Sequence, residues 1–203
     1  MTAPILLATA TVLGLLSFFE PCTIATHTLF SARAHAAAQV RCCRDLFGLW
    51  FTRSLLTVGL LLLAVTLTTP PAWGVYLPSV ALAVMASVYI VSRFVYIPVP
   101  HLEFWKLLPR GAHLSQAIKL GATLPACTLP LFLIVTALSV TLDSVVAAIG
   151  AGLLFATLFT LPTMLTALMG LSDGGRRFLN GAALATAYIT AALLSGAAIY
   201  LFF

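Results

Sequence analysis

The chain has 203 residues, of which 62% are hydrophobic and only 7% are charged. A soluble domain is about 45–50% apolar and about 25% charged, so this composition excludes a water-soluble globular protein. Polar tracts that would keep the chain disordered are missing. The net charge of +5 comes from basic residues scattered among apolar runs, which excludes the contiguous basic face that nucleic-acid binding needs. The composition therefore indicates a multi-pass protein whose partner is the lipid bilayer, with no nucleic acid bound.

Six apolar runs of helical length follow one another along the chain. One helical span needs about 20 residues, so this length allows about six spans and no second domain. Strand alternation is absent, which favours helices over a β-barrel. No Lys or Arg precedes the first run, so we expect a retained span rather than a cleaved signal peptide. The predicted spans are residues 4–32, 47–69, 72–92, 114–140, 144–169 and 178–203.

All ten Lys and Arg residues lie in or beside alternate connections between these spans. Basic residues favour the cytoplasmic side of a membrane, so this pattern predicts that both termini face outward. The first group lies between or at the edges of spans one and two, the second between spans three and four, and the third between spans five and six. The groups are Arg33, Arg41, Arg44 and Arg53; Arg93, Lys106, Arg110 and Lys119; and Arg176 and Arg177.

The segment of residues 97–113 joins spans three and four and contains Trp105 next to Lys106. Trp beside Lys is typical of the headgroup level of a membrane. We therefore expect an interfacial loop or a short surface helix, which serves either as a plain connector or as a docking surface.

A short repeated motif divides the chain into halves. Residues 22–24 read Cys-Thr-Ile and residues 127–129 read Cys-Thr-Leu, about half the chain apart. Three spans per half is an odd number, so two such halves insert in opposite directions, as in many carriers. We predict an all-α membrane protein with a single transmembrane domain over residues 1–203, whose six helices form two inverted three-helix repeats at about 1–97 and 113–203. Coincidence among Thr- and Leu-rich spans is the alternative.

Both cysteines of this repeated motif, Cys22 and Cys127, are expected near the middle of the membrane. Along a helix, Cys22 lies roughly 16 Å from Arg33, and Cys127 lies roughly 12 Å from Lys119. Half of the hydrocarbon core is about 15 Å. The two sulfurs would approach bonding distance if spans one and four pack together, which sequence spacing alone leaves open.

Prolines accompany both cysteines. Pro21 directly precedes Cys22, and Pro125 precedes Cys127 by two residues. Proline lacks a backbone N–H and suits the first position of a helix. We predict that each proline begins the second half of a broken span with its cysteine in the first turn, where the helix dipole stabilises a thiolate. Pro130 predicts a further break. The alternative is that the cysteines are inert apolar residues.

Two other ionisable residues lie close to the first cysteine. Glu20 is the only carboxylate within the apolar runs, and we expect it to exchange a proton with Cys22. In the alternative, span one ends at Phe19, which places Glu20 at the interface and residues 23–32 on the surface. His27 follows in the same run and is either a proton carrier or a hydrogen-bonded packing residue.

Cys42 and Cys43 form an adjacent pair between Arg41 and Arg44 in a predicted cytoplasmic loop. Arginine neighbours favour the thiolate, so the pair is a candidate to receive electrons or bind a soft metal ion. The alternative is two free loop cysteines. No phosphate-binding loop, zinc-finger spacing or Gly-x-Ser-x-Gly motif is present, and His27 alone does not favour a haem. We therefore expect no cofactor and assign no metal site.

Residues 15–22 read Leu-Leu-Ser-Phe-Phe-Glu-Pro-Cys and resemble the start of the CcdA/DsbD family of membrane thiol–disulfide conduits. That family has six core spans, outward termini and a Pro-Cys pair in the first span of each inverted half. The resemblance covers nearly the whole chain as architecture and is specific only around Cys22 and Cys127. Cys22 matches the first family cysteine. Cys127 matches the second, with Ala126 in place of the usual proline.

The resemblance implies a thiol–disulfide oxidoreductase of the bacterial or archaeal cytoplasmic membrane. Cytosolic thioredoxin would reduce a Cys22–Cys127 disulfide, and the rearranged pair would then pass electrons to an extracytoplasmic thioredoxin-like protein. In CcdA-type members this reduction serves cytochrome c maturation. Two other functions stay open: a small-solute or soft-metal permease on the same frame, with Glu20, His27 and the cysteines as ligands, and a non-catalytic assembly partner.

Overall fold

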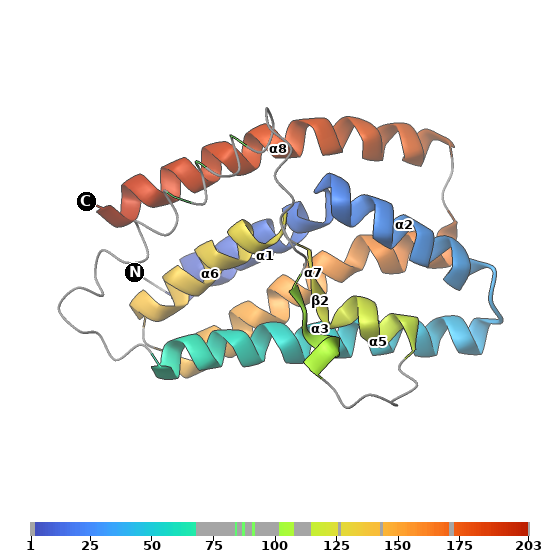
Figure 1. Cartoon of the computed structure of the whole chain (residues 1–203), viewed down its shortest axis with the longest axis horizontal. Helices are drawn as coiled ribbons and strands as arrows, with labels where there is room; N and C mark the ends of the chain where they lie inside the picture. Colours follow the sequence, from blue (N-terminus) through green and yellow to red (C-terminus); the bar gives the residue numbers. More distant parts are fainter. Residues whose placement is uncertain are drawn as a thin grey trace.

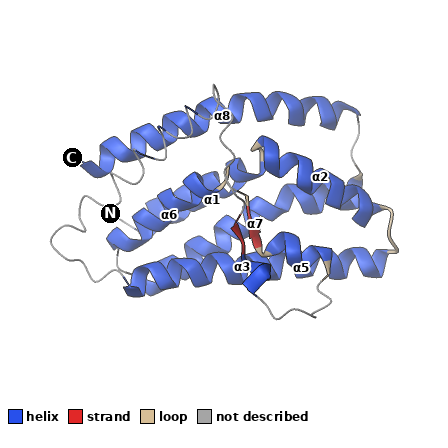
Figure 2. Ribbon diagram, in the orientation of Figure 1, coloured by secondary structure: helices blue, strands red, loops and turns tan. Residues whose placement is uncertain are grey.

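The computed structural model of the chain describes residues 3–67, 102–107, 115–125, 127–142, 144–170 and 173–202, together with residues 84, 87 and 91. Apart from those three isolated residues, the predicted third span, 72–92, lies outside this part. The described chain is all-α except for one ladder of two short strands (Figure 2).

Seven α-helices make up the described part (Figure 1). They are α1 (Ala3–Phe18), α2 (Pro21–His35), α3 (Gln39–Leu67), α5 (Gln116–Gly121), α6 (Leu129–Leu142), α7 (Val145–Met169) and α8 (Asp173–Phe202). The short elements are β1 (Leu102–Glu103), the 3-10 helix η1 (Phe104–Leu107) and β2 (Thr123–Leu124).

Two of the described helices, α3 and α7, are each long and apolar enough to cross a membrane. A third candidate span consists of α1 and α2 together, with a bend of 74° between them, and α6 is a shorter apolar helix. The chain is thus a helical protein with two or three helices suited to a bilayer. The sixfold count and the outward termini stay predictions.

Helices from the two halves of the chain run in opposite directions. In Figure 1, α1 and α2 lead from one end of the bundle to the other, whereas α5, β2 and α6 lead back. Likewise, α3 and α7 run antiparallel to one another. The N-terminal end of α1 and the C-terminal end of α8 lie at the same end of the bundle. Two inverted three-helix repeats stay a prediction.

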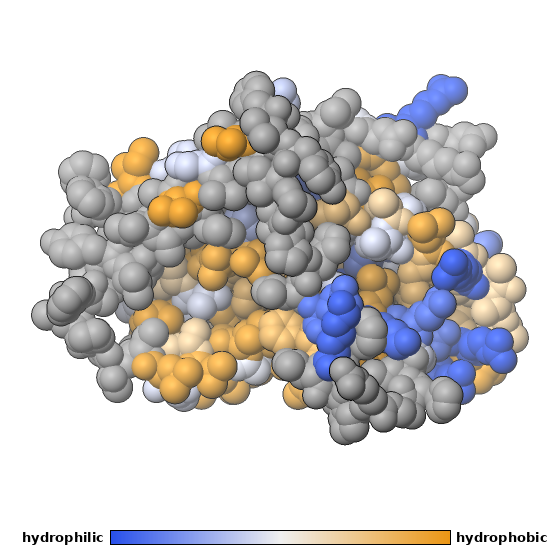
Figure 3. Space-filling view, viewed as in Figure 1, coloured by the Kyte–Doolittle hydropathy of each residue, from blue (hydrophilic) through white to orange (hydrophobic). Residues whose placement is uncertain are grey.

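At the other end of the bundle, α2 and α7 end and α3, α5 and α8 begin (Figure 1), and hydrophilic residues are seen on the surface there (Figure 3). We call this the basic end. Arg33 of α2 also donates a hydrogen bond of 3.0 Å to Gln116 of α5 there, which links the two halves. The exposed basic residues of the basic end are Arg33, Arg41, Arg44, Lys119 and Arg177.

Helix α7 packs against α1, α2 and α3 and lies at the centre of the described bundle. Glycines permit two of these close crossings. A Cβ atom at Gly14 of α1 would lie 2.6 Å from the carbonyl oxygen of Phe155, and one at Gly152 of α7 would lie 2.9 Å from a methyl carbon of Val58. In membranes, small residues at helix crossings let the two backbones approach closely. Van der Waals packing then stabilises the pair, because the hydrophobic effect does not drive association between helices in lipid.

The structure corrects the prediction that Cys42 and Cys43 lie in a loop. Helix α3 begins at Gln39, so both cysteines belong to its first turns. The helix extends this far because no Gly or Pro lies between Gln39 and Phe47, and the amide of Cys42 already donates to the carbonyl of Ala38 at 3.0 Å. Cys42 is buried and Cys43 is exposed, and both are free thiols.

The connection between predicted spans three and four also pairs with a strand of the fourth span. Within residues 97–113 the structure describes 102–107, where β1 pairs antiparallel with β2 and η1 follows. Lys106 of η1 forms an exposed ion pair with Glu103 at 3.1 Å. This piece therefore returns to the fourth predicted span at the point where that span is broken.

Candidate functional site

The first break lies between α1 and α2. Glu20 is extended, with φ −65° and ψ 137°, and Pro21 occupies the beginning of α2. The carbonyl oxygen of Glu20 accepts hydrogen bonds from the amides of Thr23 at 3.0 Å and Ile24 at 2.9 Å. Because proline needs no acceptor for an N–H, it suits this position. The prediction that Pro21 starts a new helix with Cys22 in its first turn is confirmed.

The second break is longer and contains a strand. Helix α5 ends at Gly121, and Thr123–Leu124 then pair with Leu102–Glu103. The amide of Phe104 also donates to the carbonyl of Ala122 at 3.0 Å. The predicted interruption of span four is therefore present, and a piece of chain from the preceding connection supplies hydrogen bonds to its backbone.

Cys127 itself lies in the turn before α6. Both the amide and the hydroxyl of Thr128 donate to the carbonyl of Pro125, at 3.0 and 2.9 Å. Helix α6 starts at Leu129 and has Pro130 in its first turn. The prediction that Pro125 begins this helix with Cys127 in its first turn is wrong, because the β ladder keeps the chain extended up to this point. Pro130 marks the start of α6 and not a further break.

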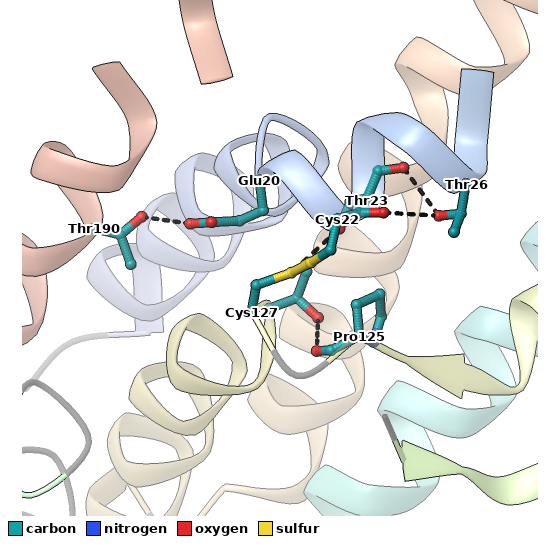
Figure 4. Close-up of a disulfide and its surroundings, with 8 residues drawn as sticks. Glu20, Cys22, Thr23, Thr26, Pro125, Cys127 and Thr190 are labelled. Carbon is teal, nitrogen blue, oxygen red and sulfur yellow. Dashed lines mark hydrogen bonds between the residues drawn. A yellow bond between two sulfur atoms is a disulfide. The ribbon is translucent and has the colours of Figure 1, made fainter. Parts of the chain in front are cut away.

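The structure brings Cys22 and Cys127 together in a disulfide (Figure 4). Their Cα atoms are 6.9 Å apart. The hydroxyl oxygen of Thr23 lies 3.9 Å from the sulfur of Cys127 and is a polar neighbour of the pair. The two sulfurs thus meet where two chain segments of opposite direction are broken.

Glu20 lies inside the bundle, with 1% of its surface exposed. Its carboxylate extends toward α8, where the hydroxyl of Thr190 donates to it at 2.8 Å (Figure 4). Thr23, His27 and Ser31 are buried in the bundle as well, and the depth of Glu20 in a membrane stays a prediction. Proton exchange between Glu20 and Cys22 stays a prediction.

Arg53 is a buried residue that the sequence analysis misplaced. We expected it at the edge of a span with the other basic residues, but it is fully buried in the bundle. The physical reason is the early start of α3, which moves Arg53 to the middle of the helix. Its position inside an apolar run, between Thr52 and Ser54, was the available signal. An arginine at this depth is a functional candidate.

The guanidinium of Arg53 joins both halves of the chain. It donates to the carbonyl of Leu120 at the end of α5 at 2.9 Å and lies 3.3 Å from the Nε2 atom of His27 on α2. It also stacks over the ring of Phe159 at 4.1 Å from the centroid. The Nδ1 atom of His27 in turn lies 2.6 Å from the hydroxyl of Thr163. Arg53 therefore holds α2, α5 and α7 together around the site.

Within the described residues, no group of three His, Cys, Asp or Glu side chains is placed to hold a metal ion. No protein-family model, curated protein or solved structure matches the chain. Function is therefore inferred from the site itself.

Proposed function

We propose that this chain is a transmembrane thiol–disulfide oxidoreductase. It carries reducing equivalents from cytosolic thioredoxin to an extracytoplasmic thioredoxin-fold acceptor, as in cytochrome c maturation or a related thiol reduction. The observation that carries the proposal is the Cys22–Cys127 disulfide at the breaks of two oppositely directed segments. A helix broken inside a membrane is tolerated where it is buried or lines a cavity, so such breaks mark functional positions.

The chemistry needs only the two cysteines and a dithiol partner on each side. A thiolate of reduced thioredoxin attacks one sulfur of the disulfide, and the other sulfur leaves as a thiolate. The second thiol of thioredoxin then resolves the mixed disulfide, so thioredoxin is oxidised and the two cysteines are reduced. The reduced pair repeats the same two exchanges with the oxidised acceptor on the outer side.

The proposed orientation has the basic end in the cytoplasm and both termini outside. Basic residues favour the cytoplasmic side, and the exposed basic residues of four helices gather at one end of the bundle. Six spans in two inverted repeats give each cysteine a similar position relative to its own side, which supports access from both sides. The proposed location is the cytoplasmic membrane of a bacterium or archaeon.

Electron transfer across vesicles tests the proposal. Oxidised thioredoxin is enclosed in vesicles that contain the protein, reduced thioredoxin is supplied outside, and thiols formed inside are trapped and counted. We expect Cys22→Ala and Cys127→Ala each to abolish transfer, because a single cysteine cannot form the disulfide that reduced thioredoxin attacks. The matched control, Cys43→Ala, removes an exposed thiol that is free and retains transfer.

Normal transfer in both single variants would reject the proposal. The same vesicles distinguish the permease alternative by uptake of Cu⁺ or of a small solute. Uptake that survives the loss of one thiol, without electron transfer by the unaltered protein, would favour a permease.

A further inference from the structure

A row of polar side chains follows one face of α2. Thr23, His27, Ser31 and His35 are spaced four residues apart, which keeps them on one side of the helix. We call them the polar row. The first three are almost completely buried, with exposures of 0%, 0% and 3%, whereas His35 is exposed at the basic end. Burying polar groups costs free energy, so a continuous buried row of them in an apolar bundle calls for a function.

Hydroxyl groups of α7 complete the polar row. The Nδ1 atom of His27 is 2.6 Å from the hydroxyl of Thr163. One turn further on, the hydroxyl of Thr166 donates to that of Ser31 at 2.9 Å, and the hydroxyl of Ser31 is shared between the carbonyls of His27 at 2.8 Å and Thr163 at 3.3 Å. At the basic end, the Nδ1 atom of His35 bonds to a carbonyl of α7 at 2.8 Å. Polar contacts therefore occur at each turn along the interface.

The inner end of the polar row reaches the disulfide. The hydroxyl of Thr23 lies 3.9 Å from the sulfur of Cys127. A hydroxyl group accepts one hydrogen bond while it donates another, so it can pass a proton along. Successive members are one helical turn apart, about 5–6 Å between Cβ atoms, so a proton path along them requires a water molecule wherever no direct hydrogen bond closes the gap.

We propose that the hydroxyl groups of the polar row, together with those of Thr163 and Thr166, conduct protons between the basic end and the Cys22–Cys127 sulfurs. This proposal rests on the proposed function, because only a disulfide that is reduced and reoxidised needs protons. The interface between α2 and α7 then has a chemical role in addition to packing.

The proton balance shows why such a path is needed. A protein dithiol at the basic end loses two electrons and two protons when it becomes a disulfide. Its sulfurs react as thiolates, so both protons pass into water before attack. The first exchange breaks the Cys22–Cys127 bond and leaves one buried thiolate, and the second exchange leaves another. Each thiolate takes one proton from the path, so two electrons and two protons reach the cysteines, and no charge stays in the apolar interior.

Arg53 orients His27, which in turn positions the hydroxyl of Thr163 in the path. A guanidinium is only a donor, so the Nε2 atom of His27 accepts from Arg53 at 3.3 Å. The proton of the neutral imidazole then resides on Nδ1 and is donated to the hydroxyl of Thr163. This leaves the O–H of Thr163 free to donate to the next group of the path. His27 and Arg53 are positioning residues, and the hydroxyl groups move the proton.

The rate of disulfide reduction tests the path. Full-length protein in vesicles is mixed with reduced thioredoxin at the basic end, in H₂O and in D₂O, and its thiols are trapped at intervals. We expect Ser31→Ala and Thr163→Val to slow reduction by about 100-fold, the usual loss when a positioned proton donor is removed. The slowing is larger in D₂O, while the reduction potential at fixed pH is unchanged.

Two further variants separate proton transfer from folding. Thr163→Ser keeps the hydroxyl and retains the rate. Thr28→Val removes a hydroxyl of α2 that bonds to backbone carbonyls of its own helix, and it also retains the rate. Wild-type rates in Ser31→Ala and Thr163→Val, or equal slowing in Thr163→Ser, would overturn the path while transfer by the wild type persists. A wild-type disulfide that thioredoxin never reduces would instead reject the proposed function.

Discussion

The two breaks supply the two cysteines of one disulfide, yet they are built differently. The first is a tight bend of 74°, in which Glu20 and Pro21 redirect the chain from one helix into the next. The second extends from the end of α5 to the start of α6 and contains a strand that pairs with β1. Cys22 therefore lies within a helix, whereas Cys127 lies in a turn.

The difference shows how backbone groups are satisfied away from water. At the first break, the carbonyl of Glu20 accepts bonds from the helix that follows it, so the bend needs no backbone partner from another segment for that group. At the second break, Ala122 bonds to Phe104 and Leu120 bonds to Arg53. Unsatisfied backbone groups are costly in an apolar medium, so the second break depends on distant parts of the chain.

The largest expected effect comes from Arg53→Leu. The change leaves the carbonyl of Leu120 without this donor and removes the contacts with His27 and Phe159. Hydrogen bonds to charged groups contribute about 1.5–3 kcal/mol, so we expect the free energy of unfolding in detergent to fall by about 3 kcal/mol. Arg44→Leu, at an exposed site on the same helix, is the control with little effect. Higher stability of Arg53→Leu would mean that desolvation of the guanidinium outweighs its contacts.

An intermediate effect is expected from Gly121→Ala, at the end of α5. The added Cβ atom would lie 2.8 Å from the carbonyl oxygen of Leu49, which is backbone of α3 and cannot turn aside. Overpacking of this kind costs about 1–3 kcal/mol, to be measured as a shift in the unfolding midpoint. In Gly59→Ala nothing lies within 4 Å of the added atom, so this control is neutral or more stable by up to about 1 kcal/mol. Equal behaviour of the two variants would show that α5 does not depend on close packing against α3.

The smallest effect is expected from Glu103→Gln beside the second break. It removes the ion pair with Lys106, whose side chain is 63% exposed. Exposed pairs contribute about 0–1 kcal/mol, so the unfolding midpoint should move little and the β ladder should persist. A loss as large as that of Arg53→Leu would show that the ladder depends on this charge pair rather than on its backbone bonds.

Much of the first break was predictable from sequence, because proline acts through its own covalent structure. Its missing N–H and fixed φ place it at the start of a helix, and Cys22 is its neighbour in the chain. For the second break, the sequence predicts the position near Pro125 but not the strand and turn that form it. The hydrogen-bond partners of its backbone are remote in sequence, and no local pattern around Pro125 predicts pairing with Leu102–Glu103. For the same reason, the burial of Arg53 was missed.

The amino-acid sequence by itself determined that the chain is helical and apolar and that Pro21 begins a new helix with Cys22 in its first turn. These properties follow from composition, local dihedral preference and spacing. Only the tertiary structure decided that Cys22 meets Cys127, that Arg53 joins α2 to α5, and that the polar row faces the hydroxyls of α7. Such contacts depend on how helices pack side by side, which the apolar character of a helix surface does not specify because almost every face of these helices is apolar.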